Sequence, residues 1–305
     1  DHGLLRPEVR GQRLAAGKAR MPFSLILATV DRTEEVGRFL ASLDAQSYRD
    51  FELIVVDQNP NGMLRPLLEP YLDKFPILHL NRPNKRGVSR ARNIGLKHVK
   101  GDVVTFPDDD CWYPPLLLEK VACFLNEHPK VDGVSGCLAS DPVVLEQSPP
   151  NPTPSGYFIR TPLQVLQVPG MVGLFLRTPV IEAVGEFDET LGPGAGTPWG
   201  SGEDTDYHLR ILNEGFVLFT NPDIVVFHPE VEFYYAGGRD LDRSYRYGAG
   251  RTRVWKRHRL PLWYFIYEVS RSWGGIMLSL VQGRGYKATW HWGAFRGKLR
   301  GWFSS

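Results

Sequence analysis

The sequence predicts an α/β protein with a mainly parallel central sheet flanked by helices, followed by a C-terminal helical extension. Short apolar runs alternate with amphipathic stretches from residue 24 to residue 106, which is typical of βαβ units with right-handed crossovers. Residues 236–305 instead interleave Trp with Arg and Lys, a pattern that favours amphipathic helices. A chain of 305 residues with 42% apolar content can form a packed core, which excludes a wholly disordered protein.

The first half divides into strands and helices by its apolar spacing. We expect strands at 24–29, 51–57, 77–80 and 102–106, and helices near 36–43, 64–72, 89–99 and 115–126. Parallel sheets bind ligands beyond the carboxyl ends of their strands. Thr29, Asp57 and the run Asp108–Asp110 fall at those ends, so we expect them to converge on one crevice.

The second half is less regular. Six prolines from Pro142 to Pro162 predict a long surface loop. We expect strands at 171–176 and 224–228, and a helix that begins at Glu203. A glycine-rich segment at 191–202 precedes that helix.

Charge is distributed unevenly. From Leu241 to the end there are thirteen Lys/Arg against two Asp/Glu, and before it twenty-three against thirty-two. The three cysteines match no paired metal spacing, which favours a reducing compartment without disulfides. Residues 1–20 are basic and lack an apolar core, so we interpret them as an extension or disordered leader and not a signal peptide. No apolar run reaches the length of a membrane span, which predicts a soluble or peripheral protein.

Three adjacent carboxylates, Asp108, Asp109 and Asp110, follow the strand that ends at Phe106. Like charges repel unless a cation compensates them. Oxygen ligands at a strand end suit Mg²⁺ or Mn²⁺, and such an ion could hold a diphosphate. Taken alone, a solvated acidic turn that caps the next helix explains the run equally well.

Arg86 and Arg90 lie where a helix opens, so cations and free backbone N–H groups occur together there. This arrangement favours an anion such as a diphosphate, because cations at a helix N-terminus are otherwise mildly unfavourable. A solvated basic helix start is the alternative. Asp57 is in the same way either a cap or a ligand.

Glu203 and Asp204 open the helix that follows the glycine-rich segment. Acidic residues stabilise a helix N-terminus, which is one sufficient explanation. A glycine-rich loop carrying Trp199 directly before two carboxylates also suits a substrate platform beside a general base. His228, at the end of its strand, is a metal ligand or simply a polar strand end.

These residues fall in five ordered motifs, and with them the chain resembles the family 2 glycosyltransferases, which have the Rossmann-like GT-A fold. The resemblance covers about Pro22 to Pro229 and rests on SLILATVDR, FELIVVDQNPNG, RGVSRARNIGLKHVKGDVVTFPDDD, GSGEDTDYHLRILNEGF and VVFHP. It implies an inverting transferase that uses a nucleotide-diphosphate sugar, UDP- or dTDP-linked, with Mg²⁺ or Mn²⁺.

The resemblance also implies residue roles. Nucleotide and donor contacts fall on Thr29, Arg32, Asp57, Arg86, Arg90, Asp108 and Asp109. Metal binding falls on Asp110 and His228, the general base on Asp204 with Glu203 beside it, and acceptor binding on Trp199 and Gly202. Pro107 and Gln58 depart from the family's pattern.

Six of the eight Trp residues follow Leu241, interleaved with Arg and Lys. Aromatic and cationic side chains on one helix suit an anionic membrane interface. Packing on the catalytic part is the main alternative, and nucleic-acid binding is the least favoured, so no nucleic acid is expected. We therefore expect a membrane contact through residues 251–305, with a cytoplasmic location on the inner face of a bacterial plasma membrane.

The predicted organisation is a leader at 1–20, a catalytic domain at 21–235 and a basic helical tail at 236–305. The catalytic domain would divide into a nucleotide-sugar half (21–110) and an acceptor half (111–235). The predicted function is sugar transfer to a hydroxyl of a glycan or lipid-linked glycan in polysaccharide synthesis. A nucleotidyltransferase and a non-catalytic sugar-nucleotide-binding membrane scaffold are the alternatives.

Overall fold

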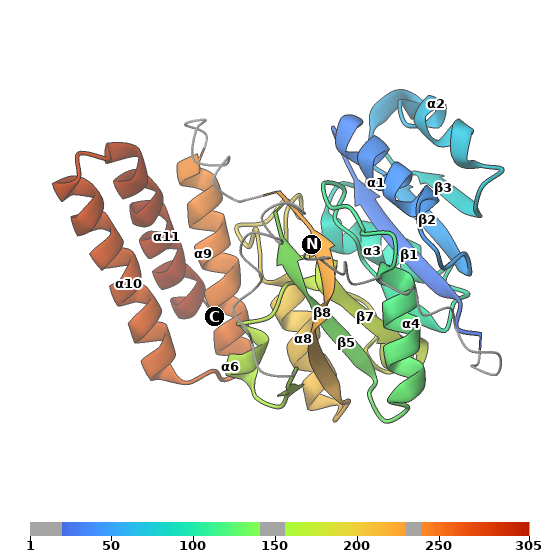
Figure 1. The fold of residues 1–305 in the computed structure, drawn as a ribbon. Coiled ribbons are helices and arrows are strands. Elements are labelled where there is room, and N and C mark those ends of the chain that lie inside the picture. Colours follow the sequence, from blue (N-terminus) through green and yellow to red (C-terminus); the bar gives the residue numbers. More distant parts are fainter. Residues whose placement is uncertain (1–19, 141–155, 230–239, 305) are drawn as a thin grey trace, which may run out of the picture.

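The computed structural model describes residues 20–140, 156–229 and 240–304. Within these ranges, a mixed α/β fold is built on one sheet of eight strands, in the order β3-β2-β1-β4-β7-β5-β8-β6 (Figure 1). The predicted leader, except Arg20, and most of the proline-rich loop lie outside the described residues. The expected α/β class with C-terminal helices is confirmed.

The first four strands are parallel, as predicted. They are β1 (Phe23–Thr29), β2 (Phe51–Asp57), β3 (Ile77–Asn81) and β4 (Val103–Thr105). The register pairs Thr29 with Asp57 and Asp57 with Asn81, so polar residues align at one edge. The apolar runs are continuous because β1 and β2 are buried on both faces.

The second half completes the same sheet with mixed directions. Its strands are β5 (Gly133–Ala139), β6 (Phe158–Ile159), β7 (Leu174–Arg177) and β8 (Leu218–Phe227). β7 runs antiparallel to both of its neighbours, β4 and β5, whereas β5 and β8 are parallel. Four of the seven neighbouring pairs are parallel, so the sheet is mainly parallel.

Three elements have different bounds in the structure from those predicted from the sequence. The predicted strand at 171–176 begins with a 3₁₀ turn, Met171–Gly173, and only then becomes β7. The predicted helix at 64–72 is a short α2 (Arg65–Leu68) followed by a 3₁₀ turn, because Pro66 and Pro70 remove backbone donors from a longer helix. β8 starts six residues before the predicted strand at 224, at Leu218.

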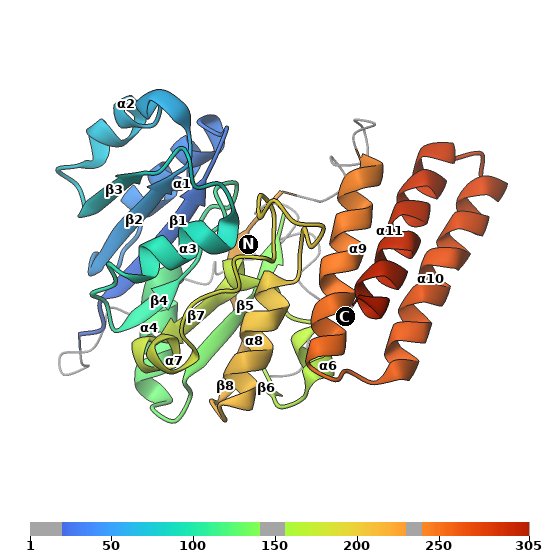
Figure 2. The same cartoon turned by 180° about the vertical axis from the view of Figure 1, so that it is seen from behind.

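Helices cover both faces of the sheet (Figures 1 and 2). α1 (Glu34–Asp44) and α4 (Leu117–Glu127) share one apolar core with β1 and β2. The opposite core contains α3 (Val88–Leu96), α7 (Thr178–Val184) and α8 (Glu203–Asn213). A short α6 (Pro162–Val165) lies beside α8.

Three C-terminal helices follow: α9 (Asp240–Arg257), α10 (Leu262–Val281) and α11 (Gly285–Phe303). α9 lies between the sheet and the α10–α11 hairpin (Figures 1 and 2). Gly293, Gly297 and Gly301 recur every fourth residue on α11, and a Cβ at any of them would collide with α9. These glycines therefore allow the two helices to approach closely. In the described part of the chain, no helix is both long and apolar enough to span a bilayer.

Candidate active site

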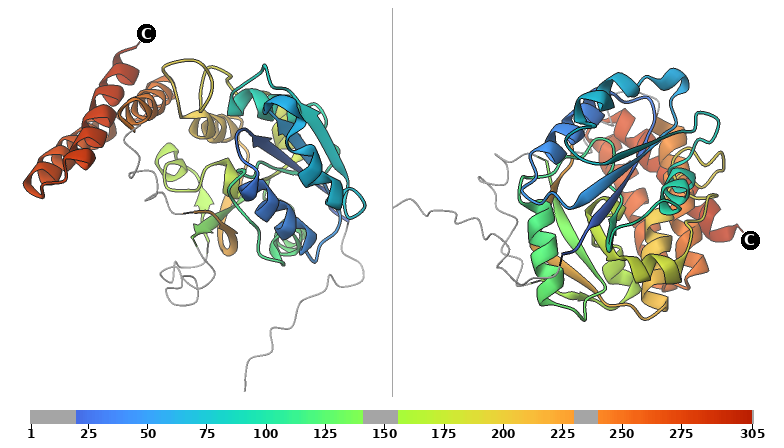
Figure 3. Two further views of the ribbon diagram at one scale, coloured as in Figure 1. Left: turned by 90° about the horizontal axis from the view of Figure 1, so that it is seen from above. Right: turned by 90° about the vertical axis from the view of Figure 1, so that its right-hand side faces the viewer.

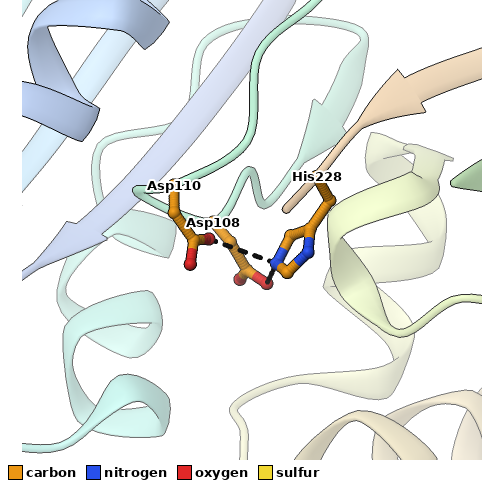
Figure 4. Close-up of side chains that lie close together, drawn as sticks. All are labelled: Asp108, Asp110 and His228. Atoms are coloured by element: carbon orange, nitrogen blue, oxygen red, sulfur yellow. Dashed lines mark ion pairs between the residues drawn. The ribbon is translucent and has the colours of Figure 1, made fainter. Parts of the chain in front are cut away.

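Asp108, Asp110 and His228 converge beyond the carboxyl ends of the strands (Figure 4). One ligand atom from each lies within 4.8 Å of the others. Two backbone hydrogen bonds between Trp112 and Phe227, of 2.9 and 3.0 Å, join the acidic loop to the end of β8. This bridge brings Asp110, two residues before Trp112, close to His228, directly after Phe227, although the two residues are more than a hundred positions apart in the sequence.

The donor atoms of this cluster suit a divalent cation. His228 Nε2 lies 3.2 Å from Asp110 Oδ1 and 3.9 Å from Asp108 Oδ2. Burial opposes ionisation, but His228 and Arg32 outweigh it and hold the pKa of Asp110 well below its usual range. Burial also lowers the pKa of His228, yet Asp110 raises it above its ordinary value overall. Two carboxylates and one imidazole are a ligand set that Mg²⁺ and Mn²⁺ accept.

Arg32 lies against the same loop. Its Nη1 is 2.8 Å from Asp109 Oδ1 and 2.5 Å from Asp110 Oδ2. Burial raises the pKa of Asp109 to about 6 although Arg32 opposes this rise. Arg32 and Asp109, both predicted to contact the donor, are thus next to the predicted metal ligand.

Arg92, which the sequence analysis did not single out, connects the acidic loop with Asp204. Its side chain is only 4% exposed, and its Nη1 lies 2.6 Å from Asp204 Oδ1 while Nη2 lies 3.5 Å from Asp108 Oδ1. Burial raises the pKa of Asp108 to about 6 despite the opposing charge of Arg92. One guanidinium therefore lies between a candidate metal ligand and the predicted base.

Glu203 and Asp204 have different surroundings at the start of α8. The Oδ2 atom of Asp204 accepts a hydrogen bond of 3.0 Å from the backbone N–H of Met171. The Oε2 atom of Glu203 is buried and has no hydrogen-bond partner among the described residues. Burial, with the adjacent charge of Asp204, raises the pKa of Glu203 to about 8. Glu203 is therefore protonated at neutral pH.

At the carboxyl end of β2, Asp57 is fully buried. Its Oδ1 accepts hydrogen bonds from the backbone and side chain of Asn59, at 2.8 and 2.9 Å. His79, another residue that the sequence analysis missed, places Nε2 2.9 Å from Oδ2. Thr29 is also buried beside this strand edge. The nucleobase contacts expected for Thr29 and Asp57 stay predictions.

Arg86 and Arg90 lie apart from the acidic cluster. Arg90 Nε is 2.8 Å from Glu189 Oε2, and Arg86 is exposed and 3.7 Å from Asp31. Arg90 and Arg92 are two residues apart on α3, so they project from nearly opposite sides of that helix. The structure brings Arg92, not Arg90, to the metal ligands.

The predicted acceptor residues pack against α9. The guanidinium carbon of Arg253 lies 4.6 Å from the centre of a Trp199 ring. Gly202 adopts φ of 98°, and a Cβ there would press on Gly250 of α9. Ser201 donates a hydrogen bond of 2.7 Å to the carbonyl of Tyr247. α9 thus supports the glycine-rich loop, and the acceptor roles of Trp199 and Gly202 stay predictions.

Comparison with known proteins identifies this arrangement. Residues 24–174 match the family model described as glycosyl transferase family 2. Glycosyltransferase AglE of Haloferax volcanii is 26% identical over 254 residues, which are 79% of this chain and 77% of that protein. A poly(ribitol-phosphate) beta-N-acetylglucosaminyltransferase, TarS of Staphylococcus aureus, is 30% identical over 125 residues, but the match spans only 22% of that protein.

Solved structures give the same fold. Residues 1–349 of Staphylococcus aureus TarS in complex with UDP-GlcNAc align with a TM-score of 0.59 at 21% identity, covering 79% of this chain and 67% of that one. The mannosyltransferase PcManGT of Pyrobaculum calidifontis, in complex with GDP-Man and Mn²⁺, aligns with a TM-score of 0.59 at 16% identity, covering 93% and 88%. The chain therefore belongs to the family 2 glycosyltransferases with the GT-A fold.

Proposed function

We propose that this glycosyltransferase is metal-dependent and inverting, and transfers a sugar from a UDP- or dTDP-linked donor to a hydroxyl of a glycan or lipid-linked glycan. The observation that carries the proposal is the position of buried Arg92, which pairs with Asp204 on one side and Asp108 on the other. A base is thereby held beside a set of metal ligands. Proteins of similar fold that bind UDP-GlcNAc, or GDP-Man with Mn²⁺, support a nucleotide-sugar donor.

Asp110, His228 and Asp108 would hold Mg²⁺ or Mn²⁺. When bound, such an ion stabilises the charge of a departing diphosphate. Asp108 is predicted from the sequence to contact the nucleotide or donor, and its place in the ligand cluster makes it a third candidate ligand. Arg32 and Asp109 would border the diphosphate, Thr29 and Asp57 the nucleobase, and Arg86 and Arg90 more distant parts of the donor.

Asp204 would act as the general base. In a single in-line displacement, the acceptor oxygen bonds to the anomeric carbon while the bond to the diphosphate breaks on the opposite face. The hydroxyl proton passes to one carboxylate, so a second acid is not required, unlike in glycoside hydrolysis. Glu203, with a pKa raised to about 8, is protonated at neutral pH and therefore suits this role less well than Asp204.

The acceptor would enter over Trp199 and Gly202, whose loop packs on α9. A lipid-linked acceptor is consistent with the basic, aromatic C-terminal helices. We therefore propose action on the inner face of a bacterial plasma membrane, in the synthesis of a surface or extracellular polysaccharide.

A donor panel with and without Mn²⁺ tests this function. We expect one nucleotide sugar to be hydrolysed slowly, with release of the nucleoside diphosphate, and to be transferred when an acceptor is supplied. Proton NMR of the product's anomeric centre should show inversion. Pyrophosphate release would instead identify a nucleotidyltransferase, and nucleotide binding without turnover of any donor would identify a non-catalytic scaffold.

A further inference from the structure

The outward face of α10 is almost entirely apolar. Nine large apolar side chains of this helix are each at least half exposed: Leu262, Trp263, Ile266, Tyr267, Trp273, Met277, Leu278, Leu280 and Val281. At about 100° per residue, they fall within an arc of about 160° around the helix. Ser270 and Gly274 also lie in this arc, which contains no charged residue.

The inward face of the same helix mixes apolar and polar side chains. Its buried residues are Phe265, Glu268, Ser272, Ile276 and Ser279. Lys298 of α11 reaches across to Glu268 Oε2 at 2.9 Å and Ser272 Oγ at 3.0 Å. A helix that contacts only water and its own protein buries its apolar side chains and exposes its polar ones. α10 instead exposes nine large apolar side chains and buries only two, Phe265 and Ile276, which indicates an apolar neighbour that the described residues do not supply.

The face lies at the far edge of the molecule. α10 is on the side of α9 and α11 that points away from the sheet (Figures 1 and 3). Its aromatic surface continues onto α11, because the rings of Trp273 and Trp292 each lie 5.8 Å from that of Phe295. Among the described residues, the sheet and its flanking helices lie on the other side of α9 and leave this face accessible to a flat surface.

The charges around the face indicate what kind of neighbour it has. Arg259 precedes α10, Arg284 and Lys287 follow it, and Glu268 is the only acidic residue after Asp242 in the sequence. Because Glu268 is buried and paired with Lys298, the surroundings of the face are basic. Two copies pairing through α10 would bring like charges together at both ends. Nucleic acid would require cations within the face, where there are none. Exposed Trp and Tyr beside basic residues favour the boundary between lipid acyl chains and anionic headgroups.

We propose that α10 docks on the surface of an anionic lipid bilayer, lying in the plane of the interface with its apolar arc among the upper acyl chains. Arg259, Arg284 and Lys287 then lie at the level of the headgroups. The helix does not cross the bilayer, in keeping with its length and hydropathy. This docking goes beyond the proposed chemistry and needs neither donor nor metal.

Sedimentation with vesicles tests the docking. One set of vesicles is made of phosphatidylcholine alone and the other of equal parts phosphatidylcholine and phosphatidylglycerol. We expect the wild-type chain to bind the anionic vesicles and to bind the neutral ones more weakly. The double variant Ile266→Glu, Met277→Glu should bind anionic vesicles at least about tenfold more weakly. Leu72→Glu is a matched control, because Leu72 is 55% exposed and Ile266 54%, but Leu72 lies in the catalytic part.

Tryptophan fluorescence locates the contact. Lipids brominated on the acyl chains should quench the tryptophan fluorescence of the wild-type protein. The double variant Trp263→Phe, Trp273→Phe should still bind the vesicles but lose most of this quenching. Circular dichroism checks that each variant is folded. The docking proposal is wrong if the wild-type protein binds neither kind of vesicle. It is also wrong if the Ile266→Glu, Met277→Glu double variant binds anionic vesicles as tightly as wild type does. Equal binding to neutral vesicles would overturn its anionic character. A dimer that the double variant dissociates, without vesicle binding, would assign the face to a second copy instead.

Discussion

Buried Arg92 and partly exposed Asp204 form an ion pair with an Nη1 to Oδ1 distance of 2.6 Å. Burial disfavours the charge of Arg92, but Asp204 and Asp108 outweigh it and raise the pKa of the guanidinium above its ordinary value. The pair links α3, which lies between β3 and β4 in the chain, with α8, which lies between β7 and β8. Its geometry therefore depends on both halves of the sheet being correctly assembled.

Replacing Arg92 by Met should damage both stability and transfer. The substitution leaves Asp108 and Asp204 without their shared partner. Breaking a fully buried pair from one side costs about 3–5 kcal/mol, and we expect a smaller loss here because the side chains of Asp108 and Asp204 are 38% and 30% exposed. Arg90→Met is the matched control for stability, because its exposed pair with Glu189 contributes less than about 1 kcal/mol. Urea unfolding and kcat/KM measure the two effects. A larger loss of stability for Arg90→Met than for Arg92→Met would contradict the structural difference between them.

Asp204→Asn should abolish transfer and leave donor binding intact. Loss of a general base slows a reaction by about 10²- to 10⁴-fold. The amide oxygen of Asn can still accept from one of the two donors, Arg92 or Met171, that bind the two carboxylate oxygens in the wild-type chain. Glu203→Gln is the paired variant and should retain most of the activity at neutral pH. Single-turnover rates and nucleotide titrations separate the effects. If Glu203→Gln loses more activity than Asp204→Asn, the base is Glu203.

Asp110→Ala and His228→Ala should each reduce the thermal shift caused by Mn²⁺ with UDP. Asp223→Ala, which removes an exposed carboxylate distant from the cluster, is the control. Only neutral His228 binds a metal, and its pKa is raised in the metal-free protein. Mn²⁺ affinity should therefore weaken as pH falls through a value above the ordinary His pKa of about 6.5. Isothermal titration across this range provides the measurement, and unchanged affinity in His228→Ala would remove that residue from the site.

Glu203 should make the free energy of unfolding pH-dependent. Its pKa is raised from 4.5 to about 8 in the folded chain, so the folded state holds this proton more tightly than the unfolded state. Its contribution to stability is therefore present at low pH and is lost as pH rises between those values. Glu203→Gln should gain stability relative to wild type across that window. Thermal unfolding without metal measures the difference in stability between wild type and Glu203→Gln at each pH, with Glu214→Gln as control. A difference that stays constant with pH would contradict the raised pKa of Glu203.

Gly250→Ala should impair acceptor use. An added Cβ on α9 would collide with the backbone of Ser201, displacing the glycine-rich loop. Gly274→Ala in α10 is the control, because no atom lies within 4 Å of an added Cβ there. We expect a raised acceptor KM with unchanged donor hydrolysis for Gly250→Ala, and near wild-type values for Gly274→Ala. Equal acceptor KM values in the two variants would show that α9 does not support the acceptor site.

The sequence predicts the parallel part of the fold well, because β1 and β2 are buried on both faces and therefore appear as uninterrupted apolar runs. β5 was not expected, since Gly133 and Gly136 interrupt its apolar pattern and glycine usually indicates a turn. The antiparallel direction of β7 depends on its partners β4 and β5, which no local pattern specifies.

The candidate site was predicted unevenly for the same reason. Asp110 follows the predicted strand that ends at Phe106, His228 ends another predicted strand, and the structure brings the two side chains together. The choice between Arg90 and Arg92 depends on how α3 is rotated relative to the sheet, which the sequence does not reveal. His79 was missed because its partner Asp57 lies on a neighbouring strand.

The glycines of α11 have a consequence for how the chain unfolds. One side of α9 packs closely against Gly293, Gly297 and Gly301, and another part of it buries Trp255 in the core shared with α8. Because both contacts are made by the same helix, unfolding of α9 would break its packing against α11 and its packing in the core at the same time. The C-terminal helices and the sheet should therefore melt in a single cooperative transition, and amides at the centre of α9 should exchange as slowly as those of β1.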